Sequence, residues 1–148
     1  MAKLYPPYIE GTIPAFYTEN IEGTDQTILT VPFSMNRSVG KVNVGGFALK
    51  MKTVNSNVFV YSNLKATAAS DYDVEDKYIV EFNLGSANKL RVGSFYKVQL
   101  AYIDVYGEIG YYSTVGIVKY TTKPSVKIEG LSYRNISASR LTYYGLYS

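Results

Sequence analysis

Acidic side chains stand at alternate positions in one short segment, an arrangement in which carboxylates can hold Ca²⁺. Asp71, Asp73 and Glu75 alternate there, and Asp76 follows directly. A calcium-binding EF-hand loop also needs glycine at its sixth position and glutamate at its twelfth. Counted from Asp71, those positions hold Asp76 and Phe82. The pattern therefore favours an acidic, solvated loop, and we expect no metal site and no cofactor.

Carboxylates could also form the pair that glycoside hydrolases use, drawn from this loop or from Glu81, Asp104 and Glu108. Such a pair must lie about 5 Å or about 6.5–9.5 Å apart, and no spacing in the sequence fixes that separation. The chain contains no His and no Cys. Their absence removes the usual proton shuttle at neutral pH, the commonest metal ligand and every thiol nucleophile. We therefore expect a protein without catalytic residues.

The charged residues do not indicate a nucleic-acid or membrane partner. Lys and Arg number 15 against 12 Asp and Glu, a formal net charge of +3, and the lysines are scattered. Such a balance bears on solubility rather than on nucleic-acid binding. Lys119-Tyr120 and Tyr133-Arg134 place basic beside aromatic residues, but alternation along a strand produces such pairs anyway. No run of about 18 uncharged apolar residues occurs, so no segment is expected to span a membrane.

Tyrosine is the most distinctive residue type, with 16 copies against 6 Phe. Its ring combines a large apolar area with a polar tip, which suits β-sheet surfaces and interfaces. Tyr106, Tyr111 and Tyr112 flank a predicted hairpin tip, so they are candidate interface residues. The alternative is that Tyr111 and Tyr112 are ordinary cross-strand partners of Tyr102. Three further candidates for an interface lie close to residue 148, namely Tyr143, Tyr144 and Tyr147.

Apolar residues alternate with polar ones in the manner of β-strands. Residues 46–53 place Phe47, Leu49 and Met51 on one face and two lysines on the other. Pro32 lacks an N–H, so we expect it at an edge, a bulge or a strand end. Turn residues separate the apolar runs at roughly the 8–12-residue spacing of an antiparallel β-sandwich. The same periodicity predicts further strands at residues 27–33, 57–62, 77–84, 96–102 and 115–121.

The spacing of Leu90, Gly93 and Tyr96 predicts a tyrosine corner. In this device a tyrosine hydroxyl reaches back to the backbone of the loop that joins two sheets, and the glycine permits the turn. Alternating apolar residues follow Tyr96 directly, as they should at the start of the next strand.

From these residues onward the sequence resembles a fibronectin type III domain. The resemblance implies a fibronectin type III-like or immunoglobulin-like sandwich over residues 1–124. The chain departs from the family in two respects: it has no Trp in the early strands, and the connection at residues 66–76 is long. The matching residues are Leu90, Gly93, Tyr96, Val98, Leu100, Ala101, Gly107, Glu108, Ser113, Thr121, Thr122 and Pro124.

The chain as a whole is similar to the opening of a bacteriophage virion structural protein of the tail-associated kind. The segments that carry this similarity are residues 1–4, 10–17, 31–37, 46–50 and 111–116. The similarity implies a non-enzymatic particle component that docks to other virion proteins through β-edges and tyrosine-rich surfaces. It leaves open the tail tube, the baseplate, a fibre or the capsid. Repeated copies are expected, because particles reuse one interface by symmetry.

The first residues contain a Lys but no apolar core of a signal peptide. We therefore expect assembly in the host cytoplasm and localisation in the virion. The alternative function is a receptor-binding or carbohydrate-binding adhesion module, for which a host surface glycan would be the partner.

Residues 125–148 are predicted to form a strand-rich extension, and the end of this segment is aromatic and uncharged. A segment of this length cannot bury a core alone. It is expected either to begin a second β module or to add strands to a neighbouring subunit. The first interpretation is preferred slightly, because an unpaired aromatic strand in water invites aggregation.

Overall fold

The computed structural model describes residues 2–10, 12–71 and 76–124, which form β-strands and one short 3₁₀ turn at Lys41–Asn43. No helix in these ranges is long and apolar enough to cross a membrane. The strands are β1 (Tyr8–Ile9), β2 (Phe16–Ile21), β3 (Thr24–Ser34), β4 (Val44–Thr53), β5 (Phe59–Ala66), β6 (Ala69–Asp71), β7 (Lys77–Asn83), β8 (Phe95–Asp104) and β9 (Gly116–Thr121).

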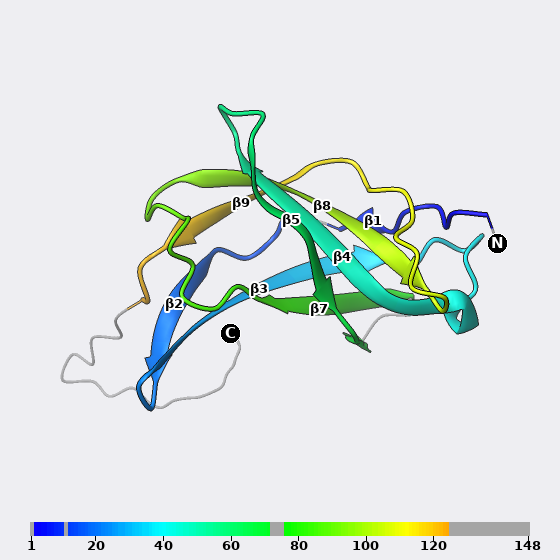
Figure 1. Ribbon diagram of the computed structural model, residues 1–148, viewed down its shortest axis with the longest axis horizontal. Helices are drawn as coiled ribbons and strands as arrows, with labels where there is room; N and C mark the ends of the chain where they lie inside the picture. Colours follow the sequence, from blue (N-terminus) through cyan, green and yellow to red (C-terminus); the bar gives the residue numbers. More distant parts are fainter. Residues whose placement is uncertain (1, 11, 72–75, 125–148) are drawn as a thin grey trace.

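The strands form two layers that are joined along one side (Figure 1). One layer has the order β5-β4-β8-β9 and the other β2-β3-β7-β6, with β1 pairing beside β3. β2 and β9 pair in parallel through Phe16 with Tyr120 and Tyr17 with Thr121, so hydrogen bonding continues from one layer into the other. The other named pairs are antiparallel. The protein is therefore all-β with the arrangement of an immunoglobulin-like sandwich.

All six strands predicted from periodicity are present, as β3, β4, β5, β7, β8 and β9. Periodicity did not predict β2, which joins β3 through the two-residue turn at Glu22 and Gly23. Both turn residues have positive φ, as the turn most favoured in β-hairpins requires. Nor did periodicity predict β6, which forms inside the connection expected at residues 66–76 and pairs with β7.

Both layers contribute side chains to a single hydrophobic core. Leu29 and Leu49 of β3 and β4, and Leu100 of β8, are fully buried. The Phe33 and Phe47 ring centroids lie 5.3 Å apart, and that of Tyr102 lies 5.8 Å from Phe47. Burial raises the pKa of Tyr102 to about 12. These contacts join β3 of one layer to β4 and β8 of the other. The residues of the predicted domain boundary after Pro124 lie outside the described ranges.

The tyrosine corner is confirmed. The Tyr96 hydroxyl accepts a hydrogen bond of 2.8 Å from the backbone N–H of Arg91, in the loop between β7 and β8. Gly93 has φ +91° there and donates its own N–H to the Tyr120 carbonyl at 2.8 Å. An L side chain rarely adopts that φ, so glycine is required for the loop to turn towards β9.

Pro32 lies two residues before the end of β3. Its carbonyl accepts the Glu10 N–H at 3.0 Å. The nitrogen of Pro32, which has no N–H to donate, therefore lies on the side of β3 that faces the two-residue strand β1. This placement agrees with the expectation of a strand end.

Candidate interaction surface

Lysine side chains project from the outer side of the β5-β4-β8-β9 layer. In β4, Phe47, Leu49 and Met51 point into the core, so the intervening Lys50 and Lys52 point outwards. The same alternation exposes residues of the other three strands. We call this outer side the lysine face, and its basic residues are Lys50, Lys52, Lys65, Lys97 and Lys119.

One row crosses all four strands of this face. Phe59 of β5 lies opposite Lys52 of β4, which lies opposite Lys97 of β8, which lies opposite Ile117 of β9. Two like charges are thus direct cross-strand neighbours, which destabilises a sheet. In the part of the chain that the structure describes, none of the five lysines forms an ion pair. The carboxylates of the described ranges therefore do not neutralise the positive charge of the face.

Aromatic rings lie beside these lysines. The Lys50 Nζ is 4.3 Å from the centroid of Tyr112 and 5.2 Å from that of Phe59. Lys119 lies 5.7 Å from the Phe95 ring, within the range of a cation–π contact. Phe95 is 48% exposed and Ile117 is 47% exposed. The face therefore combines uncompensated charge with apolar surface that contacts water.

Of the three predicted interface residues that the structure describes, Tyr112 belongs to this face. Its ring reaches across β4 to β5, where its hydroxyl lies 2.6 Å from Asn63 Oδ1. Burial raises its pKa to about 12. Tyr112 is thus a half-buried part of the surface. Tyr112 is not a cross-strand partner of Tyr102, because residues 110–115 form no strand.

Tyr106 is 79% exposed, at the tip of the turn that follows β8. The buried carboxylate of Asp104 fixes this turn by accepting the backbone N–H groups of Tyr106 and Glu108, each at 2.9 Å. Tyr106 is therefore an exposed ring on an ordered turn.

Tyr111 has different partners. Its ring stacks on Tyr5 with centroids 6.3 Å apart, and Lys3 lies 5.1 Å from it. Its N–H donates to the Leu4 carbonyl at 3.0 Å, and a Cβ on Gly110 would meet that carbonyl oxygen at 2.6 Å. The three tyrosines thus do not share contacts as one patch. Tyr143, Tyr144 and Tyr147 lie outside the described residues.

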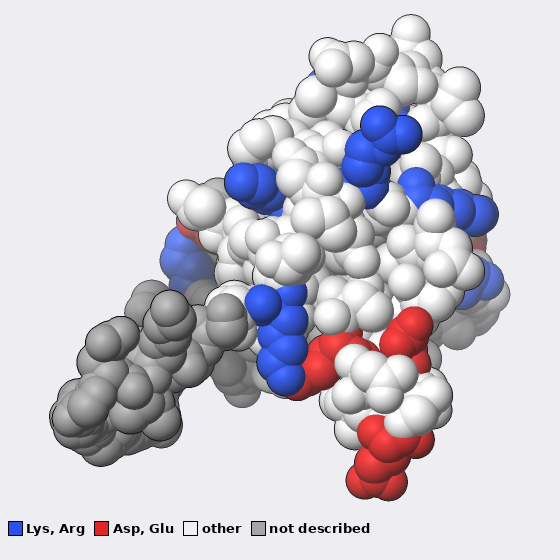
Figure 2. Space-filling view, turned by 90° about the vertical axis from the view of Figure 1, so that its left-hand side faces the viewer, with Lys and Arg blue, Asp and Glu red and all other residues white. Residues whose placement is uncertain are grey.

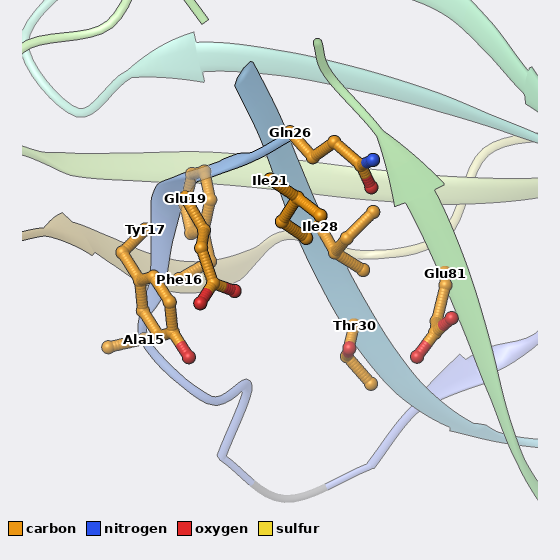
Figure 3. A pocket seen from close by; sticks show the side chains of 9 residues that line it. All are labelled: Ala15, Phe16, Tyr17, Glu19, Ile21, Gln26, Ile28, Thr30 and Glu81. Carbon is orange, nitrogen blue, oxygen red and sulfur yellow. The ribbon is translucent and has the colours of Figure 1, made fainter. Parts of the chain in front are cut away.

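The outer side of the other layer has a different character. A hollow of about 360 Å³ opens there over β2, β3 and β7. Figure 3 shows Ile21 and Ile28 in the middle of this hollow, between Glu19 of β2 and Glu81 of β7. We call it the acidic hollow. Glu19 holds Lys123 in an exposed ion pair.

A third carboxylate on this outer side, Glu10, already has partners. It accepts the Ser34 hydroxyl at 2.5 Å and pairs with Lys77 at 2.9 Å. The Ser34 hydrogen bond, followed by the contact with Lys77, lowers the pKa of Glu10. Glu10 therefore has a hydroxyl as well as a lysine partner within the chain, whereas Glu19 has the exposed Lys123.

The remaining predictions concern catalytic and metal sites. Among the described residues, no three of His, Cys, Asp and Glu come together as they would around a metal ion. Most of the acidic segment at residues 71–76 lies outside the described ranges, so the prediction of a solvated loop stays a prediction.

The lysine face was not predicted from the sequence, although the sequence contains a signal for it. No Asp or Glu occurs between Asp25 and Asp71, between Glu81 and Asp104, or between Glu108 and Glu129. The strands β4, β5 and β9 fall within these three stretches, and β8 does so up to its last residue, Asp104. Only the pairing of those strands turns scattered lysines into one basic surface. No family model matches the chain, and no curated protein matches it either.

Proposed function

We propose that this chain is a non-enzymatic structural component of a bacteriophage particle, associated with the tail, that docks to neighbouring subunits through its lysine face. The particle is proposed on the similarity of the sequence segments to virion structural proteins. The observation that carries the docking role is the row in which Lys52 and Lys97 face each other with no carboxylate partner among the described residues.

A like-charged pair beside exposed apolar side chains breaks a local rule of sheet stability, and no carboxylate of the described residues pairs with either lysine. Such breaches are expected at functional sites. A partner that brings carboxylates and apolar groups would neutralise the lysines and cover Phe95 and Ile117. Both changes favour the docked state.

Docking through a face is better supported than docking through an edge. The edge strand β5 has register shifts against β4 near Met51, and Asn63 within it has a φ of 57°. The opposite edge, β6, is three residues long. Irregular and short edges resist the addition of a further strand.

Immunogold electron microscopy of purified particles tests this proposal, with an antibody raised against residues 1–148. Gold clustered at the tail is the expected result. Antibody preabsorbed with the purified chain serves as the control and should leave the particles unlabelled. Absence of gold from intact and disrupted particles would contradict a structural role in the virion.

A carbohydrate-binding adhesion module is the second candidate, and Tyr106 favours it. An exposed ring on a turn held by Asp104 loses little entropy when it stacks on a sugar. Under this alternative, glycan binding should disappear in Tyr106→Ala and Tyr111→Ala variants. The control is Tyr8→Ala, which removes an exposed ring that is 56% accessible on β1. Unchanged glycan binding in both variants would exclude this role for the two rings.

A further inference from the structure

The two outer sides of the sandwich carry opposite charge. The acidic hollow holds Glu19 and Glu81, and the exposed β2–β3 turn beside it adds Glu22 and Asp25. Figure 2 shows the largest group of acidic side chains on the protruding lobe at the bottom of the molecule, with basic side chains mainly above it. A surface complementary to the lysine face is thus present on the same chain.

The spacing of two lysines on the lysine face also matches the spacing of the two carboxylates in the acidic hollow. Lys50 lies opposite Gln99 and Lys119 lies opposite Phe95, so these lysines are two strands apart and displaced by four residues along β8. Neighbouring strands lie about 4.8 Å apart and residues about 3.3 Å apart along a strand. The two backbone positions are therefore about 16 Å apart.

On the outer side of the other layer, Glu19 and Glu81 are spaced in the same way as Lys50 and Lys119. Glu19 lies opposite Gln26 and Glu81 lies opposite Thr30, which again gives two strands and a displacement of four residues, here along β3. The separation is again about 16 Å. Ile28 lies midway on β3 and is 37% exposed, so apolar surface separates the two carboxylates, as Phe95 and Ile117 accompany the lysines.

We infer that copies of this chain stack head to tail, with the lysine face of one copy on the acidic hollow of the next. In the stack, Lys50 and Lys119 approach Glu19 and Glu81 of the neighbouring copy. The inference rests on the proposed docking function and names its partner as a second copy. Because the two contacting surfaces differ and lie on opposite sides, the contact generates a ring or an open stack.

Other partners fit the lysine face less well. Single-stranded nucleic acid needs ring faces on which bases stack, whereas Lys50, Lys52 and Lys119 already lie against the rings of this face. The face also holds no Arg, the residue that pairs with phosphate in a bidentate manner. The exposed pair between Glu19 and Lys123 is no obstacle, because exposed pairs are weak and exchange readily.

Sedimentation of the full chain over a range of concentrations tests the inference. Two variants are compared with the wild type: Lys50→Glu with Lys119→Glu, and Glu19→Lys with Glu81→Lys. We expect the wild type to associate as concentration rises. Each double variant should raise the dissociation constant at least about tenfold, because like charges then meet at the contact. A 1:1 mixture of the two variants should associate again, because complementary faces are restored.

The matched control is Lys89→Glu with Arg91→Glu, in the loop between β7 and β8. It makes the same change in net charge as the first variant and should associate like the wild type. Association that neither double variant weakens would overturn the inference, because another surface would then be responsible.

A wild type that remains monomeric at every concentration would also overturn it. Gold labelling of particles does not depend on self-association of the chain. A monomeric wild type that still labels particles would therefore refute the head-to-tail stack and leave the proposed function intact. Binding of heparin or single-stranded DNA by a monomeric wild type, lost in Lys50→Glu with Lys119→Glu, would assign the face to a polyanion instead.

Discussion

The two layers of this sandwich are alike on their inner sides and unlike on their outer sides. Inside, β3 and β8 both contribute fully buried leucines and valines to the same core. Outside, one layer carries five lysines with no ion pair among the described residues, whereas the other carries an apolar hollow between Glu19 and Glu81. The inner sides satisfy the demands of folding, and the outer sides are where we propose that a partner docks.

The largest expected effect concerns the hydrophobic core that the inner sides of the two layers share. Leu29→Ala in one layer and Leu100→Ala in the other should each lower the free energy of unfolding by about 2–5 kcal/mol. Both side chains are fully buried, and both variants should unfold in a single transition because the layers share one core. Chemical denaturation followed by circular dichroism measures this. Two separate transitions in either variant would show that the layers do not form one core.

Alkaline pH should destabilise the fold through one tyrosine on the inner side and one on the outer side of the same layer. Burial raises the pKa of inward-facing Tyr102 and of outward-facing Tyr112 to about 12 each, whereas an unfolded tyrosine titrates near about 10. The folded state therefore holds these protons more tightly. The contribution of the two tyrosines to stability is complete below about pH 10 and should be lost as pH rises towards 12, by at most about 2 kcal/mol for each tyrosine and by less for the half-exposed Tyr112, which solvent screens.

Tyr112→Phe measures how much of this loss of stability comes from the outward-facing Tyr112. The variant should lose less stability between pH 9 and pH 12 than the wild type, as measured by urea unfolding at each pH. An identical loss in the two proteins would mean that Tyr112 is not protected from titration by burial.

The tyrosine corner gives a smaller effect at the junction between the layers. Tyr96→Phe removes the acceptor of the Arg91 N–H and should cost about 1 kcal/mol. The control is Tyr106→Phe, on an exposed ring, for which thermal unfolding should show no change. Equal melting temperatures of Tyr96→Phe and the wild type would show that the hydrogen bond of the tyrosine corner does not stabilise the fold.

The smallest effect concerns the lysine face itself. Lys52→Glu places a carboxylate opposite Lys97 and should stabilise the free chain by about 0.2–1 kcal/mol. Lys65→Glu, whose neighbour on β4 is Ala48, should leave stability unchanged. Urea unfolding of both variants measures the difference. A destabilised Lys52→Glu variant would show that the like-charged pair is not a cost to the fold.

The sequence was sufficient to predict the parts of the fold that depend on local pattern. Alternation located six strands, and the spacing of Leu90, Gly93 and Tyr96 predicted the corner, because these signals lie within a few residues. The parallel pairing of Phe16 with Tyr120 could not be predicted, since nothing local relates residues so distant in the chain.

The candidate surface was less accessible to prediction for the same reason. One of the two interpretations of Tyr111 placed it opposite Tyr102 in a strand pair, but its backbone pairs with Leu4 and its ring stacks on Tyr5. Lys52 and Lys97 become neighbours only through the register of β4 with β8. Local periodicity shows that a lysine faces outwards, whereas only the strand order shows which other lysines it faces.

Lysine acylation followed by mass spectrometry, performed on the free chain and on assembled particles, tests the central claim that the lysine face is the docking surface. We predict that Lys52, Lys97 and Lys119 react in the free chain and are protected in particles. Lys89, in the loop between β7 and β8, should react equally in both. Equal reactivity of all four lysines in the two states would contradict the claim.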